Sequence, residues 1–497
     1  MPQNDYSAAL AAISRLLGPQ RLRINNLVER AKNNLSGMLA PRILATARPA
    51  DRASLMALLR ICREHQPAIA IWPVSTGQNW GLGSWLPASD DCVVVEMNDL
   101  DRIIELDLEQ GLALIEPGVT QGQLAAAIAD TSFFLNVTAS AASCSVLGNA
   151  LDRGVGFHGQ RHRDLLALEV VLADGSELLV GGQAPLLGLR DGATLIPSAG
   201  PDLLPLFMQS NLAVVTRAAV SLRPRPERLA MVRFTVEASR LDAIVRVLHW
   251  GIDQQVICGA PRIYDASSRT VYGGAQPQTA YEAFVGVAGA EKCVEVGVKL
   301  LEAKLTEVEH ASSVEICWPP FDDIVDPLAR AVVHAFAGDP SQNDSMIRSS
   351  FGREPSQLDQ ASGSGWLTGL YLVPFNTKAL LQARAIISRL ASKVGCVQFH
   401  HTFNVLSRNT VDCVVGLRFD RSTAGANLAR QALDRIAEEF ADAGYHPYRV
   451  DNVGIARAMR HRDKNASSFG EVLRRVKYAL DPVRSLSPGR YDPSSLY

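Results

Sequence analysis

The chain of 497 residues is 47% hydrophobic and 20% charged, and its formal net charge is −2. This composition is typical of a globular protein with two or three domains, and the near-neutral charge excludes a general electrostatic attraction to nucleic acid or to an anionic membrane. The sequence has neither a signal peptide nor an apolar segment long enough to span a bilayer, so we expect a cytoplasmic protein.

Helices and strands alternate in the first part of the chain. Residues 1–18 have the pattern of a short amphipathic helix, and residues 51–65 place four apolar side chains on one helical face. The apolar segment 68–72 predicts a strand that runs directly into a glycine-rich loop. The elements predicted next are strands over 92–96, 103–107 and 112–116 and a helix over 121–130.

Two loops have the composition of a cradle for a phosphorylated cofactor. They are residues 73–84 (PVSTGQNWGLGS) and residues 145–156 (SVLGNALDRGVG). Small residues let backbone N–H groups approach an anion closely, while hydroxyl and amide side chains add hydrogen bonds. Neither loop matches the Walker motif or the dinucleotide pattern G-x-G-x-x-G. Either loop alone fits an ordinary surface turn equally well, but the pair favours a cofactor site.

The middle of the chain predicts a hairpin and then two similar units. Residues 168–172 and 177–180 flank an Asp-Gly turn, which predicts the hairpin. After residue 228 the order strand, helix, strand, strand, helix occurs twice, which predicts one broad antiparallel sheet with helices on one face. The two units are predicted over 231–237, 241–252, 256–264, 281–287 and 291–305, and over 367–374, 378–394, 397–405, 411–419 and 426–443.

Two further segments lack the pattern of a sheet. Residues 338–365 are polar and rich in Ser, Gln and Asp, so we expect a surface loop or a mobile lid. The last fifty residues predict short helices that end in a non-helical strap over 481–491, which contains two prolines and a glycine.

Cysteine and histidine are not arranged for metal binding. The eight cysteines include no C-x-x-C pair, and the ten histidines include no H-E-x-x-H motif. We therefore expect no metal site and no disulfide framework, and we expect most cysteines to be buried thiols.

Taken together, these segments resemble the vanillyl-alcohol oxidase and para-cresol methylhydroxylase family of FAD enzymes over nearly the whole chain. The Gln-Ser-Asn stretch followed by RPRPE at 223–227 is especially specific. The segments that carry the resemblance are STGQNWGLG (75–83), EPGV (116–119), VLGNALDRGVG (146–156), LFMQSNLAVVT (206–216), Tyr448-Arg449 and the Asp-Pro and Ser-Pro-Gly pairs within 481–489.

The resemblance implies an α+β fold with a two-part FAD-binding domain over 1–228, a cap domain with a large antiparallel sheet over 229–445, and a return to the first domain over 446–497. Arg490 stands where a basic residue of the family approaches the cofactor, although a solvated charge explains it equally well. The implied FAD-binding residues are Ser75, Thr76, Gly77, Gln78, Asn79, Trp80, Leu82, Pro117, Gly118, Ser143, Ser145, Val146, Gly148, Asn149, Gly154, Phe157, Ala213, Val214, Val215 and Arg490.

The resemblance also implies the chemistry, in which a hydride passes from a substrate carbon to the flavin. In many members an arginine and two tyrosines hold a phenolate oxygen. Tyr448 and Arg449 match one tyrosine and the arginine, whereas Leu82 replaces the second tyrosine and cannot donate a hydrogen bond. Ser140 stands at the position of an acidic residue near the flavin, and it cannot act as a base at neutral pH.

A histidine on the predicted strand 397–405 offers a replacement for that missing base. His400 and His401 are adjacent, so alternation sends them to opposite faces and at most one faces the cavity. A histidine such as His400 has a suitable pKa for a base, although a structural role within the sheet is the plainer interpretation.

The resemblance leaves two features of the cofactor and the assembly to be decided. Gly369 occupies the position of the histidine that tethers FAD in some members, so we expect FAD to be bound non-covalently, although Tyr371 lies nearby. A homodimer formed through the cap is possible by analogy, and the sequence does not distinguish oxygen from another electron acceptor.

The sequence therefore predicts an FAD-dependent oxidase or dehydrogenase that takes hydride from a hydroxylated or alkyl-substituted organic substrate, with an aromatic or phenolic one favoured. In this interpretation Tyr448 and Arg449 anchor its oxygen. One alternative is a non-phenolic alcohol or hydroxy acid whose carboxylate Arg449 holds. A second alternative is a relative that binds FAD but has lost catalysis.

Overall fold

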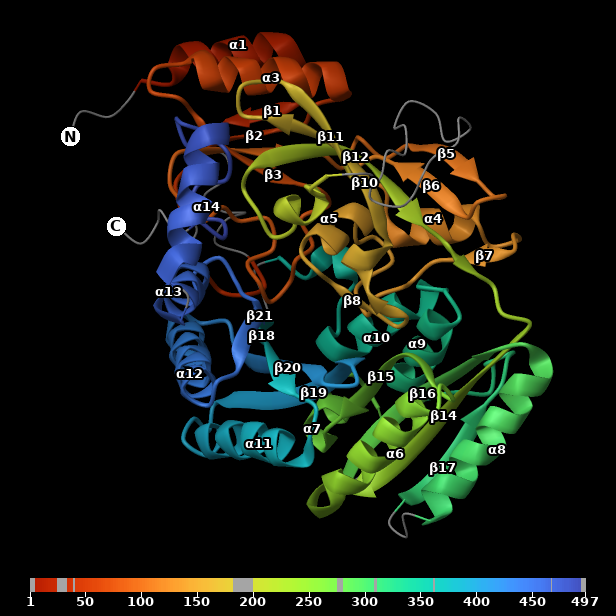
Figure 1. The fold of residues 1–497 in the computed structure, drawn as a ribbon. Coiled ribbons are helices and arrows are strands. Elements are labelled where there is room, and N and C mark those ends of the chain that lie inside the picture. Colours follow the sequence, from red (N-terminus) through yellow and green to blue (C-terminus); the bar gives the residue numbers. More distant parts are fainter. Residues whose placement is uncertain are drawn as a thin grey trace.

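The computed structural model describes residues 5–24, 34–38, 41–181, 200–274, 280–307, 311–360, 363–465 and 467–492. Its first layer is a four-stranded sheet with helices α1 (Ser7–Leu17) and α3 (Arg52–Glu64) packed beside it (Figure 1). A capping box at Asp51 starts α3, and its buried face is the apolar one that the sequence predicts. The strands lie in the order β1 (Leu22–Ile24), β2 (Ile43–Ala47), β4 (Cys92–Glu96) and β3 (Ala70–Val74).

A second sheet of five antiparallel strands lies beside the first. The predicted hairpin is present, because Leu168 pairs with Val180 across the Asp-Gly turn. The sheet order is β11 (Glu177–Gly181), β10 (Leu165–Leu172), β12 (Ala213–Ser221), β6 (Leu112–Ile115) and β5 (Ile103–Asp107). Helices α4 (Gln121–Ala127) and α5 (Val146–Leu151) accompany it, and α5 begins in the second glycine-rich loop.

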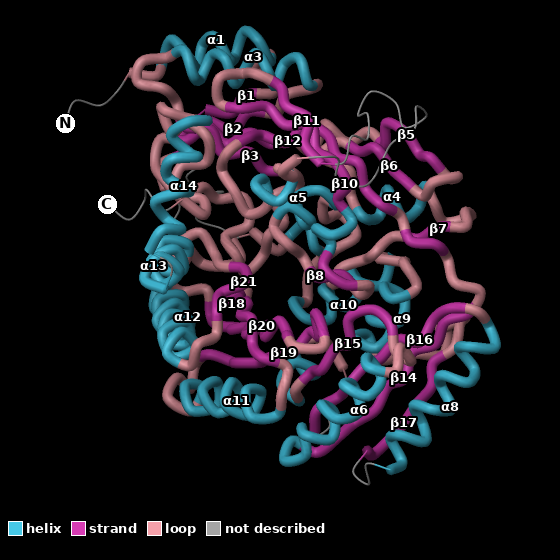
Figure 2. The backbone as a smooth tube through the Cα atoms, in the orientation of Figure 1, coloured by secondary structure: helices cyan, strands magenta, loops and turns pink. Residues whose placement is uncertain are grey.

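The central region forms the expected broad antiparallel sheet, shown by the long magenta strands in the lower half of Figure 2. Its core is packed between the sheet and α6 (Leu241–Asp253), α8 (Glu291–Glu307), α11 (Thr377–Ala391) and α12 (Thr423–Asp442). The strand order is β17 (Ala311–Cys317), β14 (Arg228–Glu237), β16 (Ala280–Gly289), β15 (Cys258–Tyr264), β19 (Val397–Ser407), β20 (Thr410–Asp420), β18 (Ser364–Pro374) and β21 (His446–Arg449).

The order of these strands repeats in mirror fashion about the β15–β19 pair. Each half contains the predicted order strand, helix, strand, strand, helix, and a strand that the sequence did not predict, β17 or β21, completes each unit. The second strands of the two units pair antiparallel at the centre. The sheet also continues past the expected boundary at residue 445, because β21 pairs with β18. Strands that the sequence separates by more than a hundred residues therefore share one surface.

The expectation of a loop or lid over 338–365 is wrong. This segment contains α10 (Ser341–Phe351) and a 3-10 turn (Pro355–Gln357), and α10 packs with α9 (Pro327–Phe336). Although the segment is polar in composition, α10 has a buried face that includes Asn343, Met346 and Ile347. A second hydrophobic core runs from the five-stranded sheet through α9 and α10. These helices therefore connect the five-stranded sheet to the broad antiparallel sheet.

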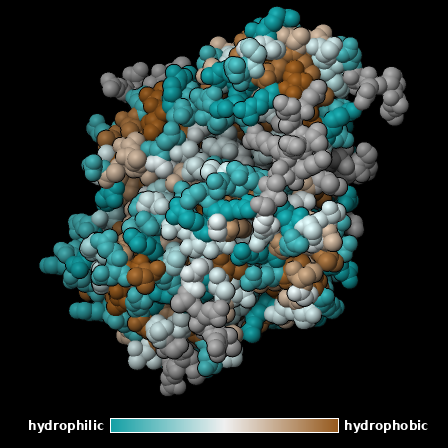
Figure 3. Space-filling model, turned by 180° about the vertical axis from the view of Figure 1, so that it is seen from behind, coloured by the Kyte–Doolittle hydropathy of each residue, from teal (hydrophilic) through white to brown (hydrophobic). Residues whose placement is uncertain are grey.

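The end of the chain returns to the first sheet. After α13 (Ile455–Asn465) and α14 (Ser467–Leu480), the strap runs beside β3, where Ile71 N donates to Ser485 O (2.7 Å) and Ser487 N donates to Ile71 O (2.8 Å). Seen from behind, the surface is largely hydrophilic, with hydrophobic residues in separate groups (Figure 3). Within the described ranges, every helix is too short or too polar to cross a membrane.

Candidate active site

One cleft brings both glycine-rich loops against the cap sheet. The first loop packs directly on β18, where Gly81 O accepts a hydrogen bond from Thr368 N (3.0 Å). Gly81 has a φ of +79°, and a Cβ there would stand 2.6 Å from Cδ1 of Trp366. Only glycine allows the loop to approach the sheet this closely.

The first loop presents a row of backbone hydrogen-bond donors. Among the described residues, none accepts a hydrogen bond from the backbone N–H groups of residues 75–81. Residues 75–80 are partly buried and line the cleft, so this row of N–H groups without protein partners offers a place for an anionic ligand. The loop therefore fits the phosphate-binding role that its composition predicts.

Side chains rather than backbone bonds tie the first loop to the second. Thr76 Oγ1 accepts from the backbone N of Ser145 (3.2 Å), and Gln78 Oε1 accepts from Ser143 Oγ (2.8 Å). Ser145 in turn caps α5 by accepting from Gly148 N (2.9 Å). The two loops are thus positioned as one unit.

A buried carboxylate joins this unit to the C-terminal segments. Asp152 Oδ2 accepts from Arg449 Nη2 (2.8 Å), and the same nitrogen donates to Asn79 Oδ1 (2.9 Å). Arg490 lies 3.6 Å from the other oxygen of Asp152. Two arginines therefore share one carboxylate, and the positive charge in excess suits an anionic cofactor.

The segment predicted as a lid instead supports the loops from the cap side. Asp359 accepts from Trp80 Nε1 (3.3 Å) and from Ser84 Oγ (2.9 Å) in the first loop. Asn343 Nδ2 donates to the backbone oxygens of Thr138 (2.7 Å) and Ser140 (2.8 Å). The start of α10 consequently fixes the backbone that carries Ser140.

Most of the expected cofactor residues line the cleft. Gly118, Ser143, Val146, Gly154, Phe157 and Val214 are not among the lining residues. Gly118, for example, is packed against backbone oxygens, where a Cβ would approach to 2.7 Å. Those that do line it are Ser75, Thr76, Gly77, Gln78, Asn79, Trp80, Leu82, Pro117, Ser145, Gly148, Asn149, Ala213, Val215 and Arg490.

The expected catalytic residues divide in the same way. Arg449 and Ser140 line the cleft, whereas Tyr448 and His400 do not. The Tyr448 hydroxyl donates to Arg153 O (2.7 Å) and accepts from Gln160 Nε2 (2.8 Å), so both its hydrogen-bonding roles are filled. Ser140 Oγ lies 2.6 Å from Thr138 Oγ1, which restrains its hydroxyl.

The two histidines of β19 occupy opposite faces of the sheet. His400 is buried beneath Trp366, with ring centroids 4.6 Å apart, and burial lowers the pKa of its imidazole to about 4. His401 Nε2 lies 2.8 Å from the Tyr281 hydroxyl on the other side. At neutral pH His400 is therefore an uncharged ring under the wall of the cleft.

Gly369 and Tyr371, the positions considered for a covalent tether, face away from the cleft. Trp366, Thr368 and Leu370 of the same strand line the cleft, so alternation places the intervening residues on the other face. There the Tyr371 ring packs at 71° against Phe440, with centroids 4.8 Å apart. Neither position therefore presents a side chain to the cleft, and non-covalent binding of FAD stays a prediction.

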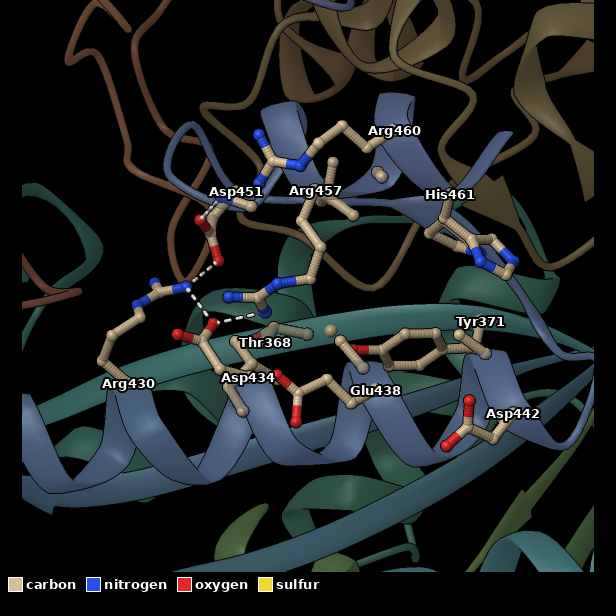
Figure 4. A pocket seen from close by; sticks show the side chains of 18 residues that line it. Thr368, Tyr371, Arg430, Asp434, Glu438, Asp442, Asp451, Arg457, Arg460 and His461 are labelled. Carbon is tan, nitrogen blue, oxygen red and sulfur yellow. Dashed lines mark hydrogen bonds and ion pairs between the residues drawn. The ribbon is translucent and has the colours of Figure 1, made fainter. Parts of the chain in front are cut away.

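Tyr371 faces a second cavity, between α12 and α13 (Figure 4). Four of its charged side chains form ion pairs with one another: Arg430 Nη1 lies 2.8 Å from Asp451 Oδ2, and Arg457 Nη1 lies 2.7 Å from Asp434 Oδ1. Of the described residues, none from either glycine-rich loop lines this cavity. The cleft is therefore the candidate active site.

Sequence reasoning missed Asp412, which is the third residue of β20 and lines the cleft. Its side chain is fully buried, its Oδ2 accepts from Asn404 Nδ2 (3.1 Å), and its Oδ1 has no partner among the described residues. Burial raises the pKa of Asp412 to about 6, which the bond from Asn404 and the charges of Arg262 and Arg449 counter only in part. A carboxylate inside an otherwise apolar strand was the available signal.

Arg262 also lines this end of the cleft and was missed. Its Nη2 donates to the backbone oxygens of Val155 (3.0 Å) and Gly156 (2.9 Å), while its Nε has no partner within the described ranges. The guanidinium stacks over the Phe157 ring at 4.6 Å. A buried cation without a carboxylate partner is a candidate to bind a substrate oxygen.

Comparisons with known proteins relate the chain to FAD-binding proteins. A family model described as an FAD binding domain matches residues 43–181. The chain is 29% identical to 1'-carboxy-chondrochloren decarboxylase from Chondromyces crocatus, over 99% of this chain and 98% of that protein. It is 27% identical to the 4-cresol dehydrogenase (hydroxylating) flavoprotein subunit from Pseudomonas putida, over 98% and 96%.

A solved structure, p-cresol methylhydroxylase with substrate bound, matches with a TM-score of 0.85 and 22% identity over 99% of this chain and 97% of that one. The expected fold class and FAD as the cofactor are confirmed by these matches. They do not address the individual site residues or a covalent link.

Gly81→Ala should weaken FAD binding at least tenfold, equivalent to about 1.4 kcal/mol. The added methyl group would collide with Trp366 and Thr368 and force a φ of +79° on an L-residue, which would displace the donor row. Fluorescence titration of the FAD-depleted protein measures the effect. Gly395→Ala is the control, because a Cβ there has no neighbour within 4 Å. Equal FAD affinity in both variants would contradict this account of the loop.

Asp412→Asn should change how stability depends on pH. Because burial raises the pKa of Asp412 to about 6, the folded protein loses stability as pH rises from about 4 through 6, and the cost at pH 8 is about 3 kcal/mol. Relative to wild type, the variant should therefore gain about that free energy of unfolding between pH 4 and pH 8.

Urea denaturation at saturating FAD measures this difference between Asp412→Asn and wild type. Asp420→Asn, at the exposed end of the same strand, is the control and should show no such gain. A difference that does not vary with pH would show that Asp412 is not perturbed in this way.

Proposed function

Because the chain belongs to the vanillyl-alcohol oxidase and para-cresol methylhydroxylase family of FAD-dependent oxidoreductases, we propose that it oxidises a hydroxylated aromatic compound in the cleft between the glycine-rich loops and the cap sheet. The observation that carries this proposal is the combination of free N–H donors on one wall with an aromatic and polar cavity on the other. The first wall suits the cofactor and the second suits a ring with a polar oxygen.

The cap side of the cleft supports an aromatic substrate. Trp366, Phe351 and Tyr272 line it, and the Phe351 and Trp366 rings meet edge to face with centroids 5.1 Å apart. Met346 and Ile347 of α10 complete an apolar wall. Such surfaces bind planar rings through burial and stacking, without fixing the substrate's identity.

When bound, FAD accepts a hydride from a substrate carbon and so supplies the redox chemistry. The residues of this chain have to orient the substrate and manage its charge. We assign Arg449 to the substrate oxygen and the neighbouring cofactor edge, because it lines the cleft and is held by Asp152 and Asn79. A guanidinium keeps its charge at every relevant pH.

Tyr448 has a different role in this proposal. Its hydroxyl is occupied by Gln160 and the Arg153 backbone, and burial raises its pKa to about 12. Its ring packs with Leu82 and Leu370, the first of which replaces the family's second tyrosine. Tyr448 therefore positions Arg449 and the second loop rather than holding the substrate oxygen.

A carboxylic acid is the second candidate substrate, and it is motivated by the name of the decarboxylase relative. Arg262 and Arg449 offer cations for a carboxylate. Asp412 disfavours the binding of a substrate carboxylate, because two carboxylates about 4 Å apart repel by about 4 kcal/mol at an effective dielectric constant of 20. A neutral hydroxyl group suits this site better, since it can donate to Asp412.

Anaerobic addition of a substrate tests the proposed activity. With 4-ethylphenol, the yellow absorbance of the FAD-loaded protein should bleach, because two electrons pass from the substrate to the flavin. The matched hydroxy acid, 4-ethylmandelate, should bleach it more slowly. Faster bleaching by the hydroxy acid would favour the second candidate, and no bleaching by either compound would favour an FAD-binding protein without this activity.

Arg449→Ala should lower the anaerobic rate of flavin reduction about 100-fold, because it removes a charge that faces the reacting substrate. Because Arg449 also holds Asn79 of the first loop, the rate is measured at saturating FAD and referred to the flavin content of each sample, which absorbance gives. Arg475→Ala, at an exposed position of α14, is the matched control. An unchanged reduction rate in Arg449→Ala would remove Arg449 from the substrate site.

A further inference from the structure

The internal repeat of the cap sheet gives Asp412 a counterpart. Ile263 pairs with Phe403 at the junction of the two halves. One residue further along each central strand, Tyr264 pairs with Glu282, and Asn404 pairs with Asp412. Glu282 of β16 and Asp412 of β20 therefore occupy equivalent register positions in the two units.

The two carboxylates have opposite surroundings. Glu282 is neutralised by two arginines: Arg233, and Arg269, whose Nε lies 2.9 Å from Glu282 Oε2. Asp412 has no ion pair among the described residues, and one of its two oxygens has no hydrogen-bond partner. An oxygen without a hydrogen-bond partner among the described residues therefore occurs in both carboxylates, Oε2 of Glu282 and Oδ1 of Asp412. The difference is that Glu282 has two arginine ion pairs, whereas the structure describes none for Asp412 in the cleft.

The free oxygen belongs to a group of polar side chains at one end of the cleft. Asp412, Asn404, Arg262 and Arg449 all line it, and they come from β20, β19, β15 and β21. Apolar side chains of Leu82, Leu370 and Val414 line the same region. The group is thus a small polar subsite in an apolar wall, which is suited to one oxygen atom of a ligand.

We propose that Asp412, positioned by Asn404, binds the hydroxyl group of the substrate and accepts its proton, while Arg449 and Arg262 face the oxygen that remains. This inference rests on the proposed function and deepens it, because it places the substrate's hydroxyl group at the cap sheet. It also assigns the base that neither Ser140 nor His400 supplies.

The proposed step is balanced in atoms and electrons. The substrate O–H bond breaks and its proton passes to Asp412 Oδ1. The released electron pair moves into the substrate as its C–H bond breaks, and the hydride leaves with two electrons to FAD. The substrate is oxidised by two electrons, FAD is reduced by two electrons, and Asp412 becomes a neutral carboxylic acid.

The inference makes opposite predictions for two ligands of similar shape. 4-Chlorophenol can donate a hydrogen bond to Asp412, whereas 4-chlorobenzoate presents a like charge to it. Neither probe has a benzylic C–H bond, so binding is measured without turnover. In Asp412→Asn, the amide oxygen stays with the Asn404 donor and the NH₂ group faces the cleft, so the subsite changes from acceptor to donor.

Asp412→Asn should therefore bind 4-chlorophenol about tenfold more weakly and 4-chlorobenzoate about tenfold more tightly than wild type. The measurement is the change of the flavin absorbance spectrum on titrating the FAD-loaded protein at pH 8. Asp412→Glu keeps the carboxylate and should keep the preference for the phenol. Asp420→Asn, on the same strand but exposed, should match wild type for both probes.

An equal change in the affinity of both probes in Asp412→Asn, or no change in either, would overturn the inference. So would the absence of 4-chlorophenol binding by wild type. Should Asp412→Asn lose FAD, a reversed preference in Asp412→Glu would overturn it, and a retained preference would support it. Failure of the proposed function is a separate result: it would appear as no bleaching by 4-ethylphenol while 4-chlorophenol still binds through Asp412.

Discussion

The loop at residues 75–81 has to keep its backbone N–H groups free of protein partners, and the architecture of the site follows from that constraint. A segment without a backbone ladder must be fixed through its side chains. Thr76 and Gln78 are held by the second loop, Asn79 by Arg449, and Trp80 by residue 359 beyond α10. These four side-chain hydrogen bonds therefore fix the orientation of the loop and the direction in which its free N–H groups point.

These ties couple the cofactor site to the cap. Asp359 and Arg449 lie more than 270 residues from the loop they hold, and one hydrophobic core continues from the five-stranded sheet into α9 and α10. The loop can consequently adopt its binding form only when the cap has folded against it. By linkage, a cofactor bound to this form stabilises the contacts of the cap as well as those of the loop.

The sequence predicts what local composition and periodicity determine. The glycine-rich loops, the Asp-Gly hairpin and the doubled order of cap elements are of this kind, and the resemblance adds FAD. The helix α10 was missed because two of the four residues on its buried face, Asn343 and Ser350, are polar. The hydroxyl of Tyr448 could not be placed, since its partners lie more than 280 residues away. Asp412 was missed because its place beside the cleft follows from how β15, β19 and β20 pair with one another.

The side chain that accepts the substrate's proton can be assigned by comparing the surroundings and the pKa of each candidate. The Ser140 hydroxyl already interacts with Thr138, and its conjugate base is inaccessible at neutral pH. Burial holds His400 uncharged beneath Trp366, so it gains no proton in the accessible range. Asp412 alone combines a place in the cleft with a pKa near 6, and keeping it ionised costs about 3 kcal/mol at pH 8. The equivalent Glu282 shows that this sheet can neutralise such a carboxylate with arginines. Burial raises the pKa of both carboxylates, but among the described residues only Glu282 has arginine ion pairs, so a ligand is the remaining source of a partner for Asp412.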